Sequence, residues 1–131
     1  MEEKEQKKWR EAKAHKRLLN AFRGLYVFVA REEHWFLPAS IFLLILVIIG
    51  SGIYFRISEF EWISLVIVIG FLIVTEVFNT AIEIDIDLTS PEYHPYARDT
   101  KDVAAGAVAF AGIVALIVVF IIFLPKILSL L

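Results

Sequence analysis

The hydrophobic residues of this chain come in long blocks that contain no charge. Residues 36–55 form one such block of 20 positions, and residues 103–125 form another of 23. A helix rises about 1.5 Å per residue, so either block is long enough to cross a hydrocarbon core of about 30 Å. A third block, 62–75, is shorter and runs into Glu76 before the apolar pattern resumes. Because a chain inside lipid must satisfy its own backbone hydrogen bonds, we interpret 61–85 as a further membrane helix.

The first 34 residues follow a different pattern, in which charges of both signs alternate with apolar residues. The apolar positions recur at spacings of three, four or seven residues, which is typical of one face of a helix. These positions are Trp9, Ala12, Leu19, Phe22, Tyr26 and Val29. An apolar face opposite a basic one predicts an amphipathic helix over 1–34 that lies in the plane of the membrane surface.

The composition also favours a membrane protein. Of the 131 residues, 59% are hydrophobic and the mean hydropathy is +0.71, which exceeds what a soluble domain of this size can bury. The formal net charge of −2 argues against a nucleic-acid partner. The chain has no cysteine, which excludes disulfides and thiolate chemistry.

The distribution of Lys and Arg predicts the orientation in the membrane. Nine of them precede the first span and two lie between the second and third, whereas the two remaining segments carry one each. The excess places the N-terminus and the loop 86–102 of a multi-pass membrane protein in the cytoplasm. We therefore expect one all-α membrane domain over 1–131, with a surface helix, three membrane helices and a cytoplasmic loop.

The second membrane segment carries a polar edge. Its members are Glu76, Asn79, Thr80, Glu83 and Asp87. At about 100° per residue these side chains fall within one arc of about 100°, whereas Asp85 falls on the opposite face. If Trp62 marks the outer interface, Glu76 lies about 21 Å inward and Glu83 about 10 Å further, near the cytoplasmic boundary.

Because these carboxylates lie at different depths in the membrane, they suit different chemical roles. At the depth of Glu76, a carboxylate suits a general base acting on a lipid hydroxyl. At the boundary, Glu83 and Asp87 suit a Mg²⁺ ion that keeps several waters and carries substrate phosphates. The alternative for Glu76 is a structural role as a buried partner of Asn79 or Lys101.

The third membrane segment begins with a second polar group. Arg98, Lys101 and Asp102 share one side of a helix, where the two cations can neutralise phosphate oxygens and Asp102 can orient the lysine or a metal. Asp99 and Thr100 are placed to cap this helix. The chain has no G-x-x-x-x-G-K-[ST] loop, so a nucleotide would be held by metal-bound carboxylates and cations.

One long segment resembles the prokaryotic diacylglycerol kinase family, which includes the undecaprenol kinases. It comprises Glu76-Val-Phe-Asn79-Thr80-Ala-Ile-Glu83, then Asp87, Glu92-Tyr93-His94-Pro95 and Ala97-Arg98-Asp99-Thr100-Lys101-Asp102-Val-Ala-Ala-Gly-Ala-Val. The resemblance implies an ATP- and Mg²⁺-dependent kinase that phosphorylates the hydroxyl of undecaprenol or diacylglycerol. It further implies a homotrimer whose active sites are shared between subunits, and it leans toward the undecaprenol branch.

The resemblance also implies a role for each matching residue. Glu76 is the expected general base, and Glu32 and Glu83 are the expected metal ligands, with Glu33 as a rival to Glu32. The expected contacts to phosphate or nucleotide are Asn79, Asp87, Glu92, Tyr93, His94, Lys101 and Asp102. Where family members tend to carry Lys or Gly, this chain has Arg98-Asp99-Thr100, which adds a charge beside the phosphate site.

Two functions of other classes remain open on the sequence. A small proton- or ion-coupled membrane protein would use Glu76 as a titrating group along a helix-lined path. A non-catalytic adaptor would use the basic surface helix to bind the membrane. The first leaves Lys101 and Asp102 without a role, and the second leaves the intramembrane carboxylate unexplained.

Overall fold

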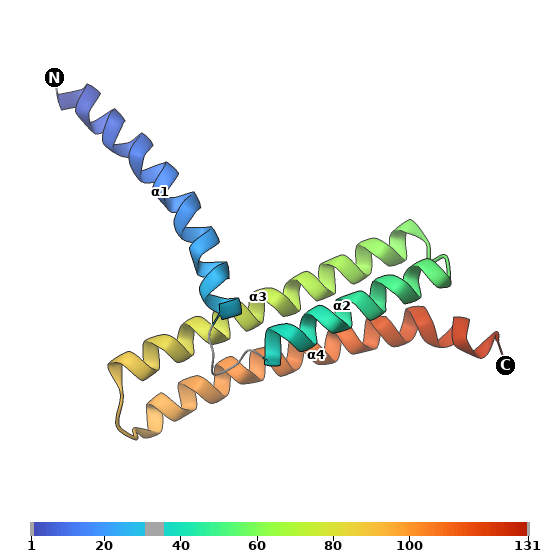
Figure 1. The fold of residues 1–131 in the computed structure, drawn as a ribbon. Helices are drawn as coiled ribbons and strands as arrows, with labels where there is room; N and C mark the ends of the chain where they lie inside the picture. The colour runs from blue at the N-terminus through green and yellow to red at the C-terminus, as the bar shows by residue number, and fades with distance from the viewer. Residues whose placement is uncertain (1, 31–35, 131) are drawn as a thin grey trace. The chain divides into compact units, whose positions relative to one another are not determined.

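The computed structural model describes residues 2–30 and 36–130, and every regular element in these ranges is an α-helix (Figure 1). The order is α1 (Glu2–Ala30), α2 (Phe36–Tyr54), α3 (Glu59–Thr89) and α4 (Pro95–Leu128). These residues form two units that divide within α2, after Phe42. The all-α class predicted from the sequence is thus confirmed.

Helix α1 covers most of the predicted surface helix. Its second half exposes the apolar side chains of Leu19, Phe22, Tyr26 and Val29, four of the positions that the helical periodicity singled out. The predicted residues 31–34, with the metal-ligand candidate Glu32 and its rival Glu33, lie outside the described residues. The placement of α1 in the membrane surface stays a prediction.

Helices α3 and α4 lie side by side and antiparallel (Figure 1). Two ion pairs join them near opposite ends. Lys126 contacts Glu61 with an Nζ–Oε1 distance of 2.9 Å, and Lys101 contacts Asp87 at the other end. Small side chains of α4 are buried between these two contacts, which lets the helices approach closely. They are Ala104, Ala111 and Ala115.

The turn between α2 and α3 is closely packed. Ser58 caps α3: the Glu61 N–H donates to Ser58 Oγ at 3.3 Å, and the Ser58 N–H donates to Glu61 Oε2 at 2.7 Å. This reciprocal pair satisfies two N–H groups at the start of the helix. Beside it, the Trp62 ring packs against buried Gly52. The surrounding core consists of Ile48, Ile57, Leu65, Ile122 and Phe123.

Replacing Gly52 with Ala should destabilise this end of the bundle. A Cβ atom there would lie 2.6 Å from two atoms of the Trp62 ring and 3.0 Å from Ile57 Cδ1. Such overpacking costs about 1–3 kcal/mol, so we expect the free energy of unfolding, measured by detergent-induced unfolding in micelles, to fall by about this amount. Gly50→Ala is the matched control, because a Cβ there meets nothing within 4 Å. An equal loss in the Gly50 variant would contradict the steric explanation.

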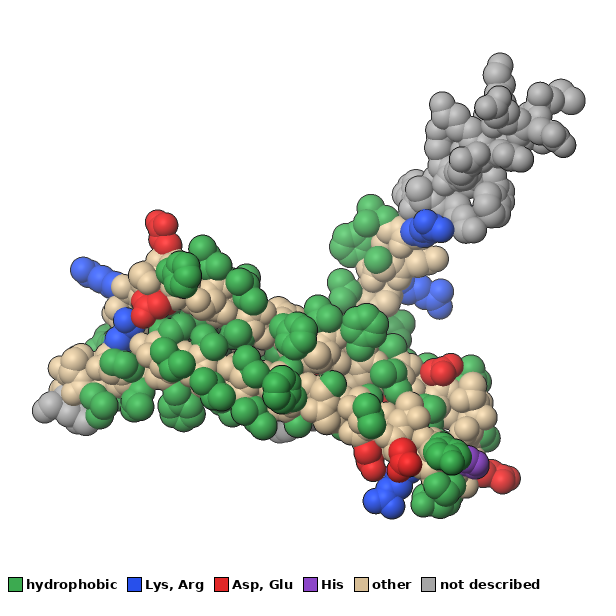
Figure 2. All heavy atoms as spheres, turned by 180° about the vertical axis from the view of Figure 1, so that it is seen from behind, with side chains coloured by type: hydrophobic (Ala, Val, Ile, Leu, Met, Phe, Trp, Pro, Cys, Tyr) green, Lys and Arg blue, Asp and Glu red, His purple; other side chains and the backbone are tan. Residues whose placement is uncertain are grey.

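The outer surface of the α3–α4 pair requires an apolar environment. Hydrophobic side chains cover its middle, and charged ones gather toward its two ends (Figure 2). Helices α3 and α4 are long and apolar enough to cross a membrane. The described apolar part of α2, Ala39–Tyr54, is shorter, so the predicted crossing by 36–55 stays a prediction.

Helices α3 and α4 both extend into residues 86–102, the segment predicted to form the cytoplasmic loop. Most of the expected loop 86–102 is helical, because α3 continues to Thr89 and α4 already begins at Pro95. The membrane segments predicted at 61–85 and 103–125 lie inside these longer helices. The hydropathy of the sequence indicates where the chain leaves the hydrocarbon core of the membrane. It does not indicate where a helix ends, because a helix with polar side chains can continue into water.

The start of α4 also differs from the prediction. The N-cap is His94, followed by Pro95 at the first helical position, where a missing N–H has no consequence. Thr100 lies inside the helix, and its hydroxyl donates to the Tyr96 carbonyl at 2.8 Å. The predicted caps Asp99 and Thr100 were therefore wrong.

Candidate functional site

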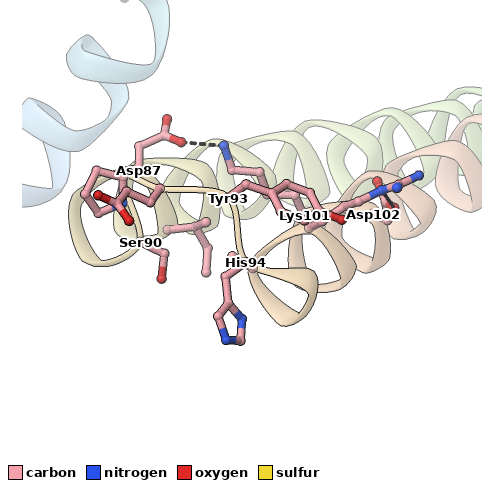
Figure 3. Close-up of a pocket in the computed structure, with 11 residues that line it drawn as sticks. Asp87, Ser90, Tyr93, His94, Lys101 and Asp102 are labelled. Atoms are coloured by element: carbon pink, nitrogen blue, oxygen red, sulfur yellow. Dashed lines mark hydrogen bonds and ion pairs between the residues drawn. The ribbon is translucent and has the colours of Figure 1, made fainter.

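An open pocket of about 430 Å³ lies where α3 ends and α4 begins (Figure 3). Six of the residues that line it are expected nucleotide or phosphate contacts. They are Asp87, Glu92, Tyr93, His94, Lys101 and Asp102. The structure therefore brings together, from two helices and a turn, residues that the sequence spreads over 16 positions.

A short turn gathers these residues. Helix α3 ends where the Ser90 N–H donates to the Ile86 carbonyl at 2.8 Å, and Pro91 follows, which cannot extend the helical hydrogen bonding. After the turn, the Tyr96 N–H donates to His94 Nδ1 at 3.3 Å, so the His94 side chain caps α4. With both helix ends fixed this closely, Asp87 and Lys101 lie within contact distance.

Each cation in the pocket contacts a carboxylate. Figure 3 shows the Lys101 ammonium of α4 hydrogen-bonded to Asp87 of α3, with the His94 ring pointing away from this pair. Arg98 Nε lies 3.5 Å from Asp102 Oδ2, one turn along α4. The Arg98 pair is largely exposed and the Lys101 pair is about half exposed, and exposed ion pairs are worth at most about 1 kcal/mol. An incoming anion can therefore replace either carboxylate at little cost.

A second polar group lies deeper along α3. Glu76 is 7% exposed, which makes it the one buried charged side chain in the described part of the chain. Among the side chains that the structure describes, none forms a hydrogen bond or an ion pair with the Glu76 carboxylate. The two ion pairs between α3 and α4 set a register that places Glu76 opposite Ala111 and Gly112. Gly112 leaves space on α4 at this level, because a Cβ added there would meet nothing within 4 Å.

Asn79 links this buried carboxylate to the helix end. Its Nδ2 donates to Glu83 Oε1 at 2.9 Å, and its Oδ1 is buried without a partner in the described structure. A buried oxygen without a hydrogen bond is unfavourable unless something else supplies the donor or cation. Asn79 therefore holds Glu83 in place and presents a further oxygen close to it.

The predicted site residues thus fall into two groups on α3 and α4. The deeper group is Glu76, Asn79 and Glu83, and none of these lines the pocket. Glu83 and Asp87 are one helical turn apart, so α3 connects the groups. Asp85 is exposed and does not line the pocket, as its opposite angular position predicts. The pocket also includes Arg98, which the sequence placed beside Lys101.

A magnesium site would draw on the oxygens around Glu83. The described residues contain no group of three His, Cys, Asp or Glu side chains arranged to hold a metal. Mg²⁺ in kinases needs fewer, because one or two carboxylates suffice when waters and substrate phosphates complete its coordination. The second Glu83 oxygen and Asn79 Oδ1 are hard donors without a partner among the described residues. These two oxygens fit a magnesium ion whose remaining ligands are waters and the phosphates of the nucleotide.

Comparison with known protein families matches residues 19–123 to the family described as prokaryotic diacylglycerol kinase. The undecaprenol kinase of Bacillus subtilis (strain 168) is 32% identical over 124 residues, which cover 88% of this chain and 98% of that protein. A diacylglycerol kinase of Synechocystis is 47% identical over 60 residues, covering 45% of this chain and 34% of that protein. One of Helicobacter pylori (strain 26695) is 33% identical over 76 residues, or 58% of either chain.

No solved structure matches the chain significantly. The family match nevertheless includes α2, α3 and nearly all of α4, with both polar groups described above. The chain therefore belongs to the prokaryotic diacylglycerol kinase family of membrane lipid kinases.

Proposed function

We propose that this protein transfers the γ-phosphate of ATP, with Mg²⁺, to the terminal hydroxyl of a membrane lipid at the cytoplasmic interface. The observation that carries the proposal is the pair of polar groups on α3. A pocket that contains the two cations Arg98 and Lys101 lies at the helix end, and the buried Glu76, which has no partner in the described structure, lies within the apolar segment. Such a helix face can meet a nucleotide from water and a hydroxyl from lipid.

The residues of the chain divide the reaction between them. Glu76 accepts the proton of the lipid hydroxyl while the hydroxyl oxygen forms a bond to the γ-phosphorus of ATP. The bond between the γ-phosphorus and the bridging oxygen breaks at the same time, and this oxygen leaves with ADP. Lys101 neutralises charge on the transferring phosphate, which is the main requirement of phosphoryl transfer. Asn79 keeps Glu83 oriented. Glu83 and Glu32 would hold Mg²⁺, which supplies neutralisation of the phosphate charge when bound.

The remaining polar residues of the pocket would position the nucleotide. Asp87, Glu92 and Asp102 offer acceptors for the hydroxyl and amino groups of a nucleoside, or for waters of a bound ion. Tyr93 and His94 offer rings beside them. Their common place in the lining of one pocket supports this role.

Undecaprenol is the lipid acceptor that we favour. The similarity to the undecaprenol kinase of Bacillus subtilis extends over 88% of this chain, whereas the diacylglycerol kinases match over 45% to 58%. Both lipids present one hydroxyl at the membrane interface, so the same base and cation serve either.

The assembly that we propose is a homotrimer in the inner membrane, with the N-terminus and the pocket on the cytoplasmic side. The exposed apolar faces of α3 and α4 need further cover, which neighbouring copies and lipid both supply. Nine basic residues before α2 support this orientation.

Transfer of labelled phosphate to undecaprenol and to diacylglycerol, compared in mixed micelles with ATP and Mg²⁺, tests the proposal. We expect transfer to undecaprenol with the higher kcat/KM and its loss when Mg²⁺ is chelated. A preference for diacylglycerol would overturn the choice of lipid. Failure with both lipids and with a total lipid extract, from folded protein, would overturn the kinase activity.

The buried Glu76 also favours one second candidate, a proton path along α3. That function predicts proton flux across liposomes without ATP. Flux that disappears in Glu76→Gln, together with the absence of phosphate transfer, would favour this function over the kinase.

A further inference from the structure

Arg98 lies in the pocket with a large part of its hydrogen-bonding capacity unused. It lines the same cavity as Lys101, three residues further along α4, so the two cations lie on neighbouring turns of one helix face. Its described contact is a single Nε–Oδ2 approach of 3.5 Å to Asp102, and its side chain is 68% exposed. A guanidinium carries five N–H donors, and the others have no partner among the described residues.

The local helix does not explain this arginine. Arg98 lies in the first turns of α4, where the helix dipole is positive and a cation is unfavourable. The first turn of α4 contains no acidic residue that would offset it. The exposed pair with Asp102 contributes little. Residues that break a local rule without a structural gain are typical of functional sites.

The geometry points to Arg98 as a second phosphate-binding cation, which contacts the polyphosphate of the nucleotide beside Lys101. Side chains three residues apart on a helix are about 5–6 Å apart at Cβ, so both can reach adjacent phosphates of one chain. The planar fork of the guanidinium matches two phosphate oxygens, whereas Lys101 acts as a point charge. This inference rests on the proposed kinase function and assigns Arg98 to nucleotide binding.

Kinetics of Arg98→Gln test the assignment. We expect the KM for ATP to rise about tenfold, the loss of one charge-assisted contact, with kcat within twofold of the parent enzyme. Arg98→Lys should recover part of the affinity. The matched control is Arg56→Gln, the same change at an exposed arginine in the α2–α3 turn, remote from the pocket. An unchanged KM in Arg98→Gln, or an equal rise in Arg56→Gln, would overturn the inference.

Two inhibitors separate a phosphate contact from a contact to the base. Inhibition by tripolyphosphate, with Mg²⁺ kept in excess, should weaken in Arg98→Gln by the same factor as the KM for ATP. Inhibition by adenosine should not change. Weaker inhibition by adenosine with unchanged tripolyphosphate inhibition would overturn the assignment to phosphate.

The lipid composition separates nucleotide phosphate from a phosphate of a lipid headgroup. In micelles of a neutral detergent without anionic lipid, the effect of Arg98→Gln should persist. An effect that appears only when anionic lipid is added would assign Arg98 to headgroups and overturn the inference. Phosphate transfer by the parent protein in the same micelles establishes the kinase independently, so the inference can fail while the proposed function stands.

Discussion

Replacing Glu76 with Gln should lower the rate of phosphate transfer to lipid by about 10²–10⁴-fold, the usual contribution of a general base. The amide keeps the size of the side chain but cannot take the proton of the attacking hydroxyl. Glu76 is buried and has no hydrogen bond or ion pair in the described structure, so removing its charge should not destabilise the fold. We expect kcat to fall while the KM for ATP stays near that of the parent.

Asp85→Asn is the matched control for this variant. Asp85 lies on the same helix, beyond Glu83, and its side chain is exposed. Asp85→Asn therefore makes the same change from carboxylate to amide on an exposed face. Helix content and the size of the assembly, measured by circular dichroism and chromatography, show whether either variant is folded. Near-normal transfer by folded Glu76→Gln would remove Glu76 as the base, and an equal loss in Asp85→Asn would assign the effect to charge in general.

The helices were predictable because membrane segments leave a strong signal in one dimension. Uncharged runs located α3 and α4, and inclusion of Glu76 in one helix followed from the rule that backbone in lipid must be internally bonded. The ends of these helices were not predictable in the same way. They depend on caps such as His94 and on the proline that follows it, which act beyond the apolar segment.

The site was predictable as far as single helices determine it. Angular position alone placed Asn79 and Glu83 together, and the structure has them hydrogen-bonded at 2.9 Å. It likewise placed Arg98 beside Asp102. Contacts between helices needed the antiparallel register, which the short turn between α3 and α4 determines. The Asp87–Lys101 and Glu61–Lys126 pairs, and the contact of Trp62 with Gly52, therefore emerged only from the structure.

Replacing Lys101 with Gln should lower kcat/KM for ATP by about 10²–10³-fold, the range for removal of one stabilising group from a charged transition state. The lysine reaches across the helix pair into the pocket, and phosphoryl transfer depends chiefly on neutralising phosphate charge. Stability should change little, because its contact with Asp87 is half exposed.

Lys126→Gln provides the matched control at the opposite end of α4. Lys126 also joins α4 to α3, through its 2.9 Å contact with Glu61, and is less exposed than Lys101. Its loss should therefore lower stability at least as much as the loss of Lys101, while phosphate transfer per folded enzyme should remain near normal. If both variants lost activity in proportion to their loss of folded protein, the Lys101 effect would be structural. Both lysines form an ion pair between α4 and α3, but only Lys101 lines the pocket. A loss of phosphate transfer in Lys101→Gln alone would therefore assign the effect to the charge of Lys101 on the nucleotide.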